Sequence, residues 1–538
     1  MNKGPARTSL AGLRVTSSTT LLSRVLGMVR DMATASLFGL AGGGVMDAFV
    51  VAFRIPNLFR RLFGEGALTA SYLPIFSGVL ERDHRAAWQL ASVTMTWLSA
   101  VLAGLVVLGE LVCSLVLAVA GDLPGVQLVA GLAATMMPYL LLICLTAQLA
   151  ATLHALSHFA MPAFAPVVLN VLWLVAVWGV APRFAPDKVA QAYVLAVFVV
   201  IAGVVQLWMQ WMALRRHGFR YEYNWQSSRD ELRRIVQAMA PMMLGLAATQ
   251  LNTLLDVLMA WGLSATPESG ATIAWLGGVE YPMAQGAAAA VYLGERLYQF
   301  PVGVLGVAVA TVIFPLLSRH AARGDLDSLG SDLTLGLRLV VLLGLPASVG
   351  LVLLAEPIAR LLFLRGEFTA EDAERAARMV AAYGTGVWAY CALPVLVRGF
   401  YAMGDHSTPM RSSLMVVTAN LLLNLSLVWV MAEMGLAVST AACAMAQVIV
   451  LAVVFSRTAS RLQWRVLART ATVSLVASVV MGAACWYILR ALPRGEGLRD
   501  ELARVGVPVV VSLAVYLAVV AVARRAELRI LWATRERA

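Results

Sequence analysis

The 538-residue sequence carries little charge. Its 41 basic and 30 acidic residues make up 13% of the chain, whereas a soluble globular protein has about 25%. Apolar side chains account for 60% of the residues, and the mean hydropathy is +0.79. This composition excludes an ordinary soluble enzyme. About 14 membrane spans of roughly 20 residues each would leave room for short loops but for no large soluble domain.

Lysine and cysteine are also scarce. Lys3 and Lys188 are the only lysines, and neither lies in a GxxxxGK phosphate-binding loop, which excludes ATP hydrolysis by that route. The five cysteines lie far apart in apolar runs without CxxC spacing, so the sequence predicts neither a disulfide framework nor a zinc site. We expect them to be small buried residues.

Charged and Pro/Gly-rich clusters divide the chain into fourteen apolar segments, which we interpret as membrane helices, the first of them uncleaved. At the end of the fourth segment, His154 and His158 have i, i+4 spacing but lack the glutamate of an HExxH motif, so we expect no metal there. The segments are 10–38, 45–78, 88–118, 127–156, 163–182, 189–214, 235–263, 287–318, 333–354, 377–402, 410–432, 435–456, 467–489 and 505–523.

The arginines are distributed unevenly between the loops. The loops after the second, sixth, eighth and twelfth segments carry two to six arginines each, whereas those after the first, third, seventh and eleventh carry no lysine or arginine. The positive-inside rule therefore predicts that both termini and the basic tail are cytoplasmic. This asymmetry accounts for the net charge of +11 without a nucleic-acid partner. The mixed-charge loops after the ninth and thirteenth segments are expected to form surface helices.

An internal repeat appears at an offset near 245 residues. Residues 155–162 match residues 402–409, and residues 66–74 resemble residues 306–318. The repeat predicts an all-α polytopic membrane protein with two six-helix lobes, 1–225 and 226–460, in parallel pseudo-twofold arrangement around a central cavity. Residues 461–538 would form helices 13 and 14 and a basic cytoplasmic tail.

Ionisable residues interrupt the first two segments. At the centre of a span each would cost roughly 2.5–3.5 kcal/mol, so most of them should face a protein-enclosed cavity instead of lipid. They include positions on shared helical faces, since Arg24, Gly27 and Asp31 recur at steps of three and four. The ionisable set is Arg24, Arg30, Asp31, Asp47, Arg54, Arg60, Arg61 and Glu65.

Proline follows the charged residues in both halves of the repeat. Pro56 should break or kink the second segment, and in the second half Arg296 and Gln299 precede Pro301. Arginines converging on a cavity suit a diphosphate or another polyanion, because the guanidinium stays charged and offers forked donors to phosphate oxygens. The alternative is that these residues are interfacial anchors or internal ion pairs, such as Arg30 with Asp31.

Three motifs together resemble the MurJ (MviN) family of lipid II flippases, in the multidrug/oligosaccharidyl-lipid/polysaccharide exporter superfamily. They are SRVLGMVRD at 23–31, Asp-Ala-Phe at 47–49 and RIPNLFRRLFGEGA at 54–67. Residues 159–170 and 295–306 and the fourteen-segment plan extend the resemblance over nearly the whole chain. Two features depart from the family: the stretch 264–286 is long, and Gln299 stands where some members have an acid.

The resemblance implies a transporter, not an enzyme, in the bacterial cytoplasmic membrane, where surrounding lipids and a lipid-linked precursor are its partners. Two lobes would alternate access and carry the headgroup of the peptidoglycan precursor lipid II outward, with helices 13 and 14 lining a groove for its polyprenyl tail. The first-lobe acid of the family falls on Asp47. The implied substrate-binding residues are Arg24, Arg30, Asp47, Arg60, Arg61, Glu65 and Arg296.

The resemblance implies no cofactor, so transport needs another energy source. The membrane potential favours outward movement of a negative headgroup by about 2.3 kcal/mol per charge per 100 mV. Some relatives bind sodium, and oxygen ligands suit such a cation; helix–helix hydrogen bonding is the alternative role for the residues concerned. The candidate sodium ligands are Asp256, Asp405, Asn420 and Asn424, with Asn252 one turn from Asp256.

Three other functions stay open. A different polyprenyl-linked oligosaccharide flippase would share the same plan, whereas a small-molecule antiporter of the superfamily would more naturally carry acidic cavity residues and twelve segments. A membrane glycosyltransferase would need a catalytic carboxylate near an extracytoplasmic loop. The excess of arginine and the two additional C-terminal segments favour the lipid II flippase.

Overall fold

The computed structural model describes residues 5–523 except 41, 122, 268, 274–275, 460, 494 and 496. Side chains at 5–17, 64–67, 241, 244–246 and 248–249 lie outside this description. The chain divides into two compact units. Unit 1 comprises Met1–Trp261 with Thr266–Gly270, and unit 2 comprises Gly262–Ala265 with Ala271–Ala538.

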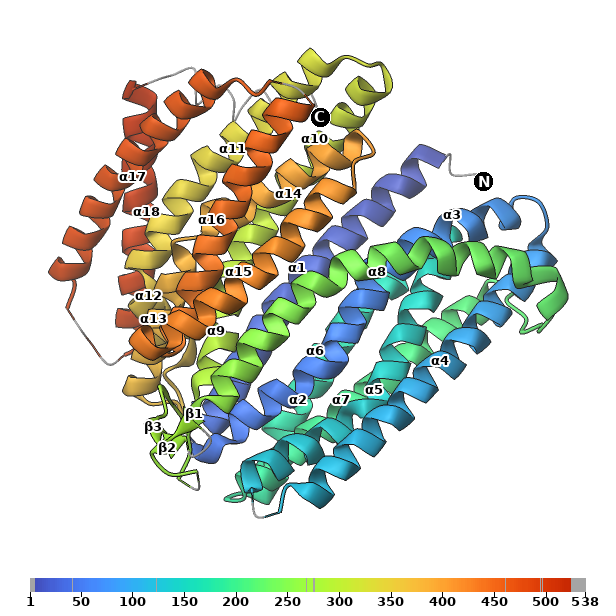
Figure 1. Ribbon diagram of the computed structural model, residues 1–538, viewed down its shortest axis with the longest axis horizontal. Helices are drawn as coiled ribbons and strands as arrows, with labels where there is room; N and C mark the ends of the chain where they lie inside the picture. The colour runs from blue at the N-terminus through green and yellow to red at the C-terminus, as the bar shows by residue number, and fades with distance from the viewer. Residues whose placement is uncertain are drawn as a thin grey trace. The chain divides into compact units, whose positions relative to one another are not determined.

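Unit 1 consists of long apolar helices joined by short turns (Figure 1). The helix α5 packs against both α4 and α7, and α1 packs against α6. Short π and 3-10 turns are η1 (Gly42–Gly44), η2 (Arg60–Ala67), η3 (Ala176–Val180) and η4 (Ala181–Phe184). The α-helices are α1 (Pro5–Phe38), α2 (Val45–Phe59), α3 (Leu68–Leu80), α4 (His84–Val119), α5 (Pro124–Ala155), α6 (Ala160–Val175), α7 (Lys188–Arg216) and α8 (Trp225–Gly262).

The chain turns sharply between α1 and α2, and of the predicted break or kink at Pro56 the structure shows no break. The helices on either side of residues 39–41 are bent by 115°, and Gly39, Gly43 and Gly44 have positive φ, which costs glycine little. By contrast, Pro56 lies inside α2. The π-helical turn η2 follows α2 directly, and the helical run continues through it into α3.

Unit 2 contains the remaining helices and a small β segment (Figure 1). A π-helical turn, η6 (Val302–Gly306), follows Pro301 just as η2 follows Pro56. The α-helices are α9 (Ala287–Pro301), α10 (Val307–Ala322), α11 (Leu326–Leu353), α12 (Ala355–Phe363), α13 (Ala370–Gly384), α14 (Val387–Ala402), α15 (Ser407–Met431), α16 (Glu433–Thr458), α17 (Trp464–Ala491) and α18 (Leu498–Ala523).

The long stretch 264–286 forms two short strand pairs. The strand β1 (Ser264–Ala265) pairs in parallel with β4 (Met283–Ala284), and β2 (Thr272–Ile273) pairs antiparallel with β3 (Val279–Glu280). Arg375 of α13 donates hydrogen bonds to the carbonyl oxygens of Gln285 and Ala284 at 2.7 and 3.2 Å. These bonds hold the end of the stretch against α13, and α9 begins at Ala287 as predicted.

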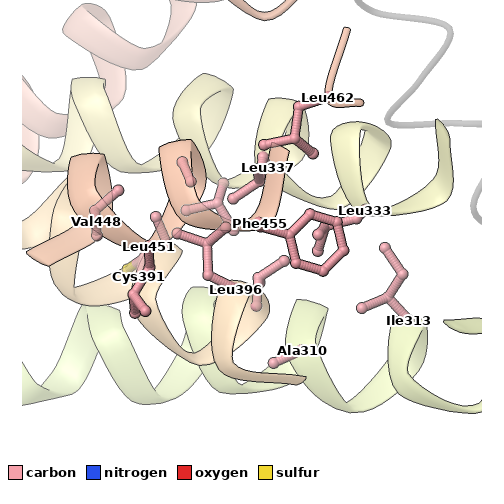
Figure 2. Close-up of a cluster of buried hydrophobic side chains, with 14 of the residues drawn as sticks. Ala310, Ile313, Leu333, Leu337, Cys391, Leu396, Val448, Leu451, Phe455 and Leu462 are labelled. Carbon is pink, nitrogen blue, oxygen red and sulfur yellow. The ribbon is translucent and has the colours of Figure 1, made fainter. Parts of the chain in front are cut away.

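Four helices of unit 2 meet in a buried apolar cluster (Figure 2). Phe455 of α16 lies at its centre and packs edge-on against Phe400 of α14, with ring centroids 5.2 Å apart. Leu333 and Leu337 of α11 and Ile313 of α10 complete the contact. The core thus consists of one face from each helix, which is the arrangement expected for amphipathic packing in a bundle.

Each of the fourteen predicted segments coincides with a helix or a helical run. Ten helices in the described part of the chain are long and apolar enough to cross a membrane, or up to twelve if each of two bent pairs counts as one span. Unit 1 extends to Trp261, beyond the predicted lobe boundary at 225/226. Ser227 and Gln250 of α8 explain this, since they bond to Gln89 and Arg61 of unit 1.

The internal repeat is visible in corresponding junctions. α5 ends at Ala155 and α6 begins at Ala160, while α14 ends at Ala402 and α15 begins at Ser407. The two π-helical turns also have matching neighbours. The thiol of Cys144 lies 3.9 Å from the carbonyl oxygen of Phe59, just before η2. The thiol of Cys391 lies 4.0 Å from the carbonyl oxygen of Pro301, just before η6.

Gly306 allows η6 to approach α14 closely, and its substitution tests this packing. A Cβ atom there would lie 2.7 Å from Cys391 Cα and 3.0 Å from its carbonyl oxygen. We expect Gly306→Ala to destabilise the protein by about 1–3 kcal/mol through overpacking, measured by thermal unfolding in detergent. Gly104→Ala in α4 is the control, since a Cβ there meets nothing within 4 Å. Equal unfolding temperatures for the two variants would contradict the close approach.

Candidate substrate-binding site

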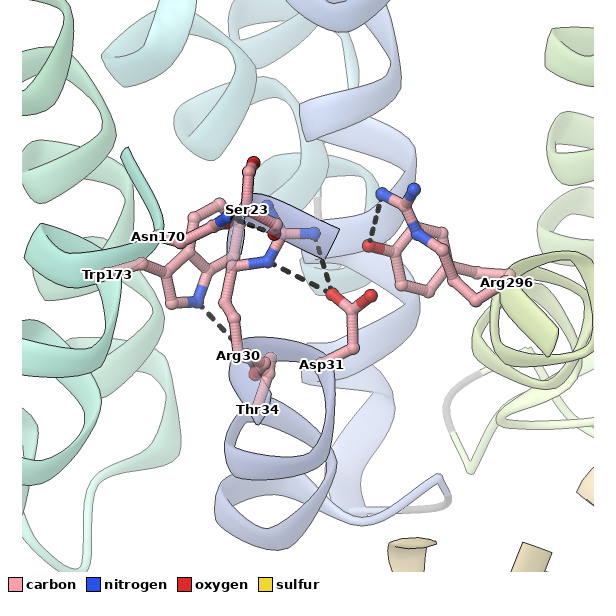
Figure 3. Close-up of polar contacts among 8 residues, drawn as sticks. Ser23, Arg30, Asp31, Thr34, Asn170, Trp173 and Arg296 are labelled. Carbon is pink, nitrogen blue, oxygen red and sulfur yellow. Dashed lines mark hydrogen bonds and ion pairs between the residues drawn. The ribbon is translucent and has the colours of Figure 1, made fainter. Parts of the chain in front are cut away.

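The best-defined polar cluster of unit 1 surrounds Arg30 (Figure 3). This side chain is only 6% exposed on α1. Its Nε and Nη2 atoms donate to Asp31 Oδ1 at 3.0 and 2.7 Å, and Nη1 donates to Asn170 Oδ1 of α6 at 3.2 Å. The guanidinium also lies over the ring of Trp173, 4.7 Å from its centroid. The charge of Arg30 is therefore balanced by Asp31, and its guanidinium is held by contacts to both α1 and α6.

The partners of Arg30 are themselves fixed. Asn170 Nδ2 donates to the Ser23 carbonyl oxygen at 3.0 Å, and Trp173 Nε1 donates to Thr34 Oγ1 at 3.0 Å. Thr34 in turn donates to the Arg30 carbonyl oxygen at 2.9 Å. Because these hydrogen bonds cross from α1 to α6 or close a turn of α1, the cluster orients the guanidinium.

Aromatic rings of α2 enclose the far side of Trp173. Phe49 and Phe53 contact it edge-on, with ring centroids 5.4 and 5.2 Å apart. Two charged residues lie on the same helix: Asp47 is 2% exposed and Arg54 is 7% exposed. The predicted burial of charge in the second segment is thus confirmed for both.

Arg60 and Arg61 lie in η2, where the helix widens. Arg60 Nε donates to Asn57 Oδ1 at 3.0 Å, and Arg61 Nη1 donates to Gln250 Oε1 of α8 at 3.4 Å. Both side chains are half-buried. Arg60 and Arg30 lie within electrostatic range of the same buried hydroxyl, that of Tyr139 in α5, so they belong to one region of unit 1.

Two other predicted residues of unit 1 differ from these. Arg24 is exposed on α1, on the same helical face as Asp31. It makes no hydrogen bond or ion pair with another residue that the structure describes. The side chain of Glu65 lies outside the described residues. The suggested Arg61–Glu65 pair therefore stays a prediction, whereas the alternative Arg30–Asp31 pair is confirmed.

Arg296 is the corresponding cation in unit 2. It lies on α9, where its Nη2 atom donates to the hydroxyl of Tyr292 at 2.9 Å, and its guanidinium lies 4.9 Å from the centroid of the same ring (Figure 3). The neighbouring Glu295 is 4% exposed. Tyr292 lies one turn before Arg296, so α9 itself sets the orientation of this guanidinium.

Positive charge predominates in the helices of the unit 1 site. Residues 18–67 contain five arginines against three carboxylates, Asp31, Asp47 and Glu65. Even with every carboxylate ionised, this segment keeps a positive excess inside an apolar bundle. Such an excess can hold an anion, and guanidinium forks match the oxygens of a phosphate or diphosphate.

The candidate sodium ligands do not form one group. Asn424 Nδ2 donates to Asn420 Oδ1 at 2.9 Å, and Ser439 of α16 donates to Asn424. Asp405 instead caps α15, accepting from the backbone N–H of Ser407 and Thr408 at 3.0 Å each. About 15 helical positions, roughly 22 Å, separate Asp405 from Asn420, so Asp405 cannot share a site with the two asparagines.

Asp405 and Asp256 each have a local partner. Burial alone would raise the pKa of Asp405, but hydrogen bonds from the side chain and backbone of Thr408 hold that pKa below its ordinary value. Asp256 belongs to unit 1, where it is 1% exposed and accepts from Asn252 Nδ2 at 3.4 Å. No cluster of three His, Cys, Asp or Glu side chains suited to a metal occurs among the described residues.

Sequence reasoning missed Asn170, Trp173 and Tyr292 as parts of the site. Asn170 did carry a signal, because it is the one amide or charged side chain in α6, and an isolated polar residue in a span usually meets another. The aromatic residues carried none. Aromatic side chains are common throughout apolar spans, and the helix face alone does not reveal a cation above the ring.

The fold and the buried cations define a polytopic α-helical transporter, not an enzyme. A solved multidrug resistance transporter of the MATE family, in the MOP superfamily, in an inward-facing conformation, aligns with a TM-score of 0.60 at 12% identity, covering 85% of this chain and 98% of that one. That similarity concerns the fold alone.

The chain belongs to the MurJ family. The family model described as lipid II flippase MurJ matches residues 34–502. A Vibrio cholerae protein named probable lipid II flippase MurJ is 33% identical over 440 residues, 79% of each chain. A solved lipid II flippase MurJ in an inward closed conformation aligns with a TM-score of 0.74 at 19% identity, covering 95% of this chain and 98% of that one.

Removing the carboxylate beside Arg30 tests whether the cluster stabilises the fold. Asp31→Ala leaves a buried guanidinium without its counter-charge, and we expect a loss of about 3–5 kcal/mol, seen as lower yield and a lower unfolding temperature in detergent. Glu222→Ala is the matched control, because its partner Arg85 is 76% exposed, and it should change the unfolding temperature little. An Asp31→Ala variant as stable as Glu222→Ala would refute the role of the pair.

Proposed function

We propose that this protein is a flippase that moves lipid II from the cytoplasmic to the periplasmic leaflet of the bacterial inner membrane. The observation that carries the proposal is the arginine excess of α1, α2 and η2, in which Arg30 and Arg54 are buried, in a chain that belongs to the MurJ family. A diphosphate is the part of such a substrate that needs this charge, whereas a cationic drug would be repelled by it.

In this proposal the arginines take different parts. Arg24, which is exposed, makes the first contact with the diphosphate. Arg30 is oriented by Asn170 and Trp173, and it exchanges the Asp31 carboxylate for phosphate oxygens when the substrate enters. Arg60 and Arg61 add further donors in unit 1, Arg296 is the substrate-binding arginine of unit 2, and Asp47 and Glu65 balance the charge when the site is empty.

The remaining parts of the substrate need different surroundings. In this proposal the sugar and peptide groups stay with the diphosphate in polar surroundings, while the polyprenyl tail stays in apolar surroundings. Helices α17 and α18 suit the tail, because their outward residues are apolar and exposed, among them Leu475, Val479, Val510 and Leu513. Alternating access would then carry the headgroup across while the tail stays in hydrocarbon.

The orientation follows from the loops. The basic loops, together with both termini, lie in the cytoplasm under the positive-inside rule. The loops predicted after the second and sixth segments are joined by an ion pair, in which Arg85 Nε donates to Glu222 Oε2 at 2.9 Å. This hydrogen bond lowers the pKa of Glu222 below its ordinary value. The ion pair is therefore retained at neutral pH and is lost only as the pH falls through that lowered pKa.

The energy source in the proposal is the membrane potential, with sodium as a second candidate. An inside-negative potential favours outward movement of a diphosphate by about 2.3 kcal/mol per charge per 100 mV. The Asn420–Asn424–Ser439 group offers oxygen atoms that suit a hard cation. Lipid II translocation in vesicles, with and without an imposed potential and with sodium or potassium, separates the two.

Single substitutions of the arginines test the site. Arg24→Ala, Arg30→Ala and Arg296→Ala should each slow lipid II transport in vesicles by roughly 10- to 100-fold, as expected from about 1.5–3 kcal/mol for a hydrogen bond to a charged group. Each should also fail to support growth of cells depleted of their own flippase. The exposed Arg82→Ala is the control for insertion and yield.

Lysine at the same positions should not restore transport, because an ammonium is a point charge and not a planar fork. Protein levels in the membrane, measured in parallel, exclude a trivial loss. Full growth with all three alanine variants would overturn the assignment of the arginines, and an absence of lipid II transport by the unaltered protein would overturn the function itself.

A further inference from the structure

The α17–α18 pair packs on the rest of unit 2 mainly through α11, and the buried apolar cluster at this contact is small. The cluster comprises five residues on three helices, Leu342, Ala477, Met481, Tyr516 and Val520. Hydrocarbon chains solvate apolar side chains as well as a protein interior does, so apolar contact alone gives little force for helix association in a membrane. Polar contacts and close packing must therefore fix the position of this pair.

A proline creates one such polar contact. Pro346 lies inside α11 and lacks the N–H that would bond to the carbonyl oxygen four residues earlier, at Leu342. The hydroxyl of Tyr516 on α18 donates to that oxygen at 2.6 Å. Tyr516 is 2% exposed, so no lipid or water competes for the bond.

The helix α17 lies beside this contact and joins it. Ser474 Oγ is 2.9 Å from Tyr516 Oη and 3.3 Å from the Val341 carbonyl oxygen. One turn before Ser474, Thr470 accepts from Arg338 Nε of α11 at 2.9 Å. The three helices thus share a buried pair of hydroxyl groups, those of Ser474 and Tyr516, that ends on the backbone of α11.

Close packing sets the same register further along α17. A Cβ atom on Gly482 would lie 3.0 Å from Val349 Cγ1 of α11, so a larger residue would push the helices apart. At its other end α18 is held by Glu501, which accepts from Arg360 Nε of α12 at 3.0 Å. Fifteen positions further along α18, Tyr516 gives this helix its hydrogen bond to the backbone of α11.

We propose that Tyr516 is a positioning residue that caps the carbonyl oxygen exposed by Pro346 and so fixes α17 and α18 in one register on α11. The pair then moves as part of unit 2, and its apolar outer surface keeps the shape that a long polyprenyl chain contacts. This inference rests on the proposed function, in which α17 and α18 bind the lipid tail.

Tail length distinguishes positioning from a general structural effect. In vesicles, Tyr516→Phe should raise the half-saturating concentration of lipid II with its full-length tail at least fivefold and leave the maximal rate unchanged. For an analogue with a two-isoprene tail, which cannot span the surface of α17 and α18, the same variant should match the unaltered protein. Tyr223→Phe, in the loop before α8 of unit 1, is the control, since Tyr223 is 55% exposed and lies outside α17 and α18.

The origin of the contact at Pro346 gives a second, independent test. Pro346→Ala restores an N–H that can bond to the Leu342 carbonyl oxygen within α11, so the Tyr516 hydroxyl is no longer needed there. Tyr516→Phe should lower the unfolding temperature clearly in the unaltered background and by less than half as much when combined with Pro346→Ala. A Tyr516→Phe variant that fails to accumulate should be rescued by the same second substitution.

Equal effects of Tyr516→Phe in both backgrounds, or equal effects on both tail lengths, would overturn the positioning role. An unaltered protein that transports neither lipid would instead overturn the proposed function. In that case the unfolding measurements still decide whether Tyr516 caps the exposed carbonyl oxygen, so the two failures are distinguishable.

Discussion

The structure depends on one constraint: a charge inside an apolar bundle must find its partners in the protein. Arg30 meets this constraint with a carboxylate, an amide and an aromatic ring, contributed by α1 and α6. The contacts with Asn170 and Trp173 also hold the two helices together, since each would be costly to break in a medium without water. A binding site and a helix interface are therefore built from the same atoms. A substrate that competes for Arg30 also acts on the packing of α1 against α6.

Prolines inside the helices impose a second constraint, which concerns the hydrogen bonds of the backbone. After Pro56 and after Pro301 the helix widens instead of ending, and in each case the thiol of a buried cysteine on a neighbouring helix lies near the carbonyl oxygen of the residue just before the π-helical turn. Pro346 leads to a different solution, in which the hydroxyl of Tyr516 satisfies the carbonyl oxygen. Backbone groups that lose their helical partner must be satisfied within the protein, so the Leu342 carbonyl oxygen freed by Pro346 requires a donor from a neighbouring helix.

Much of the fold could be predicted because membrane helices show a strong local signal. Apolar length located all fourteen segments, and segments such as 189–214 differ from the observed α7 by one or two residues at each end. The largest error lies at α8, which begins at Trp225 and not at 235. Its first turns carry Arg229, Arg233 and Arg234 and resemble a loop in composition, but Leu232, Ile235 and Met239 give them a buried face.

The sequence by itself determined the number and order of the helical segments, the internal repeat and the excess of arginine, because these depend on composition and on spacing along one helix. Only the tertiary structure decided which partner each charge has: Asn170 and Trp173 for Arg30, Gln250 for Arg61, and a helix terminus for Asp405. Such pairings join residues up to about 190 positions apart. They arise from how helix faces meet, and the pattern within a single helix does not specify its neighbour.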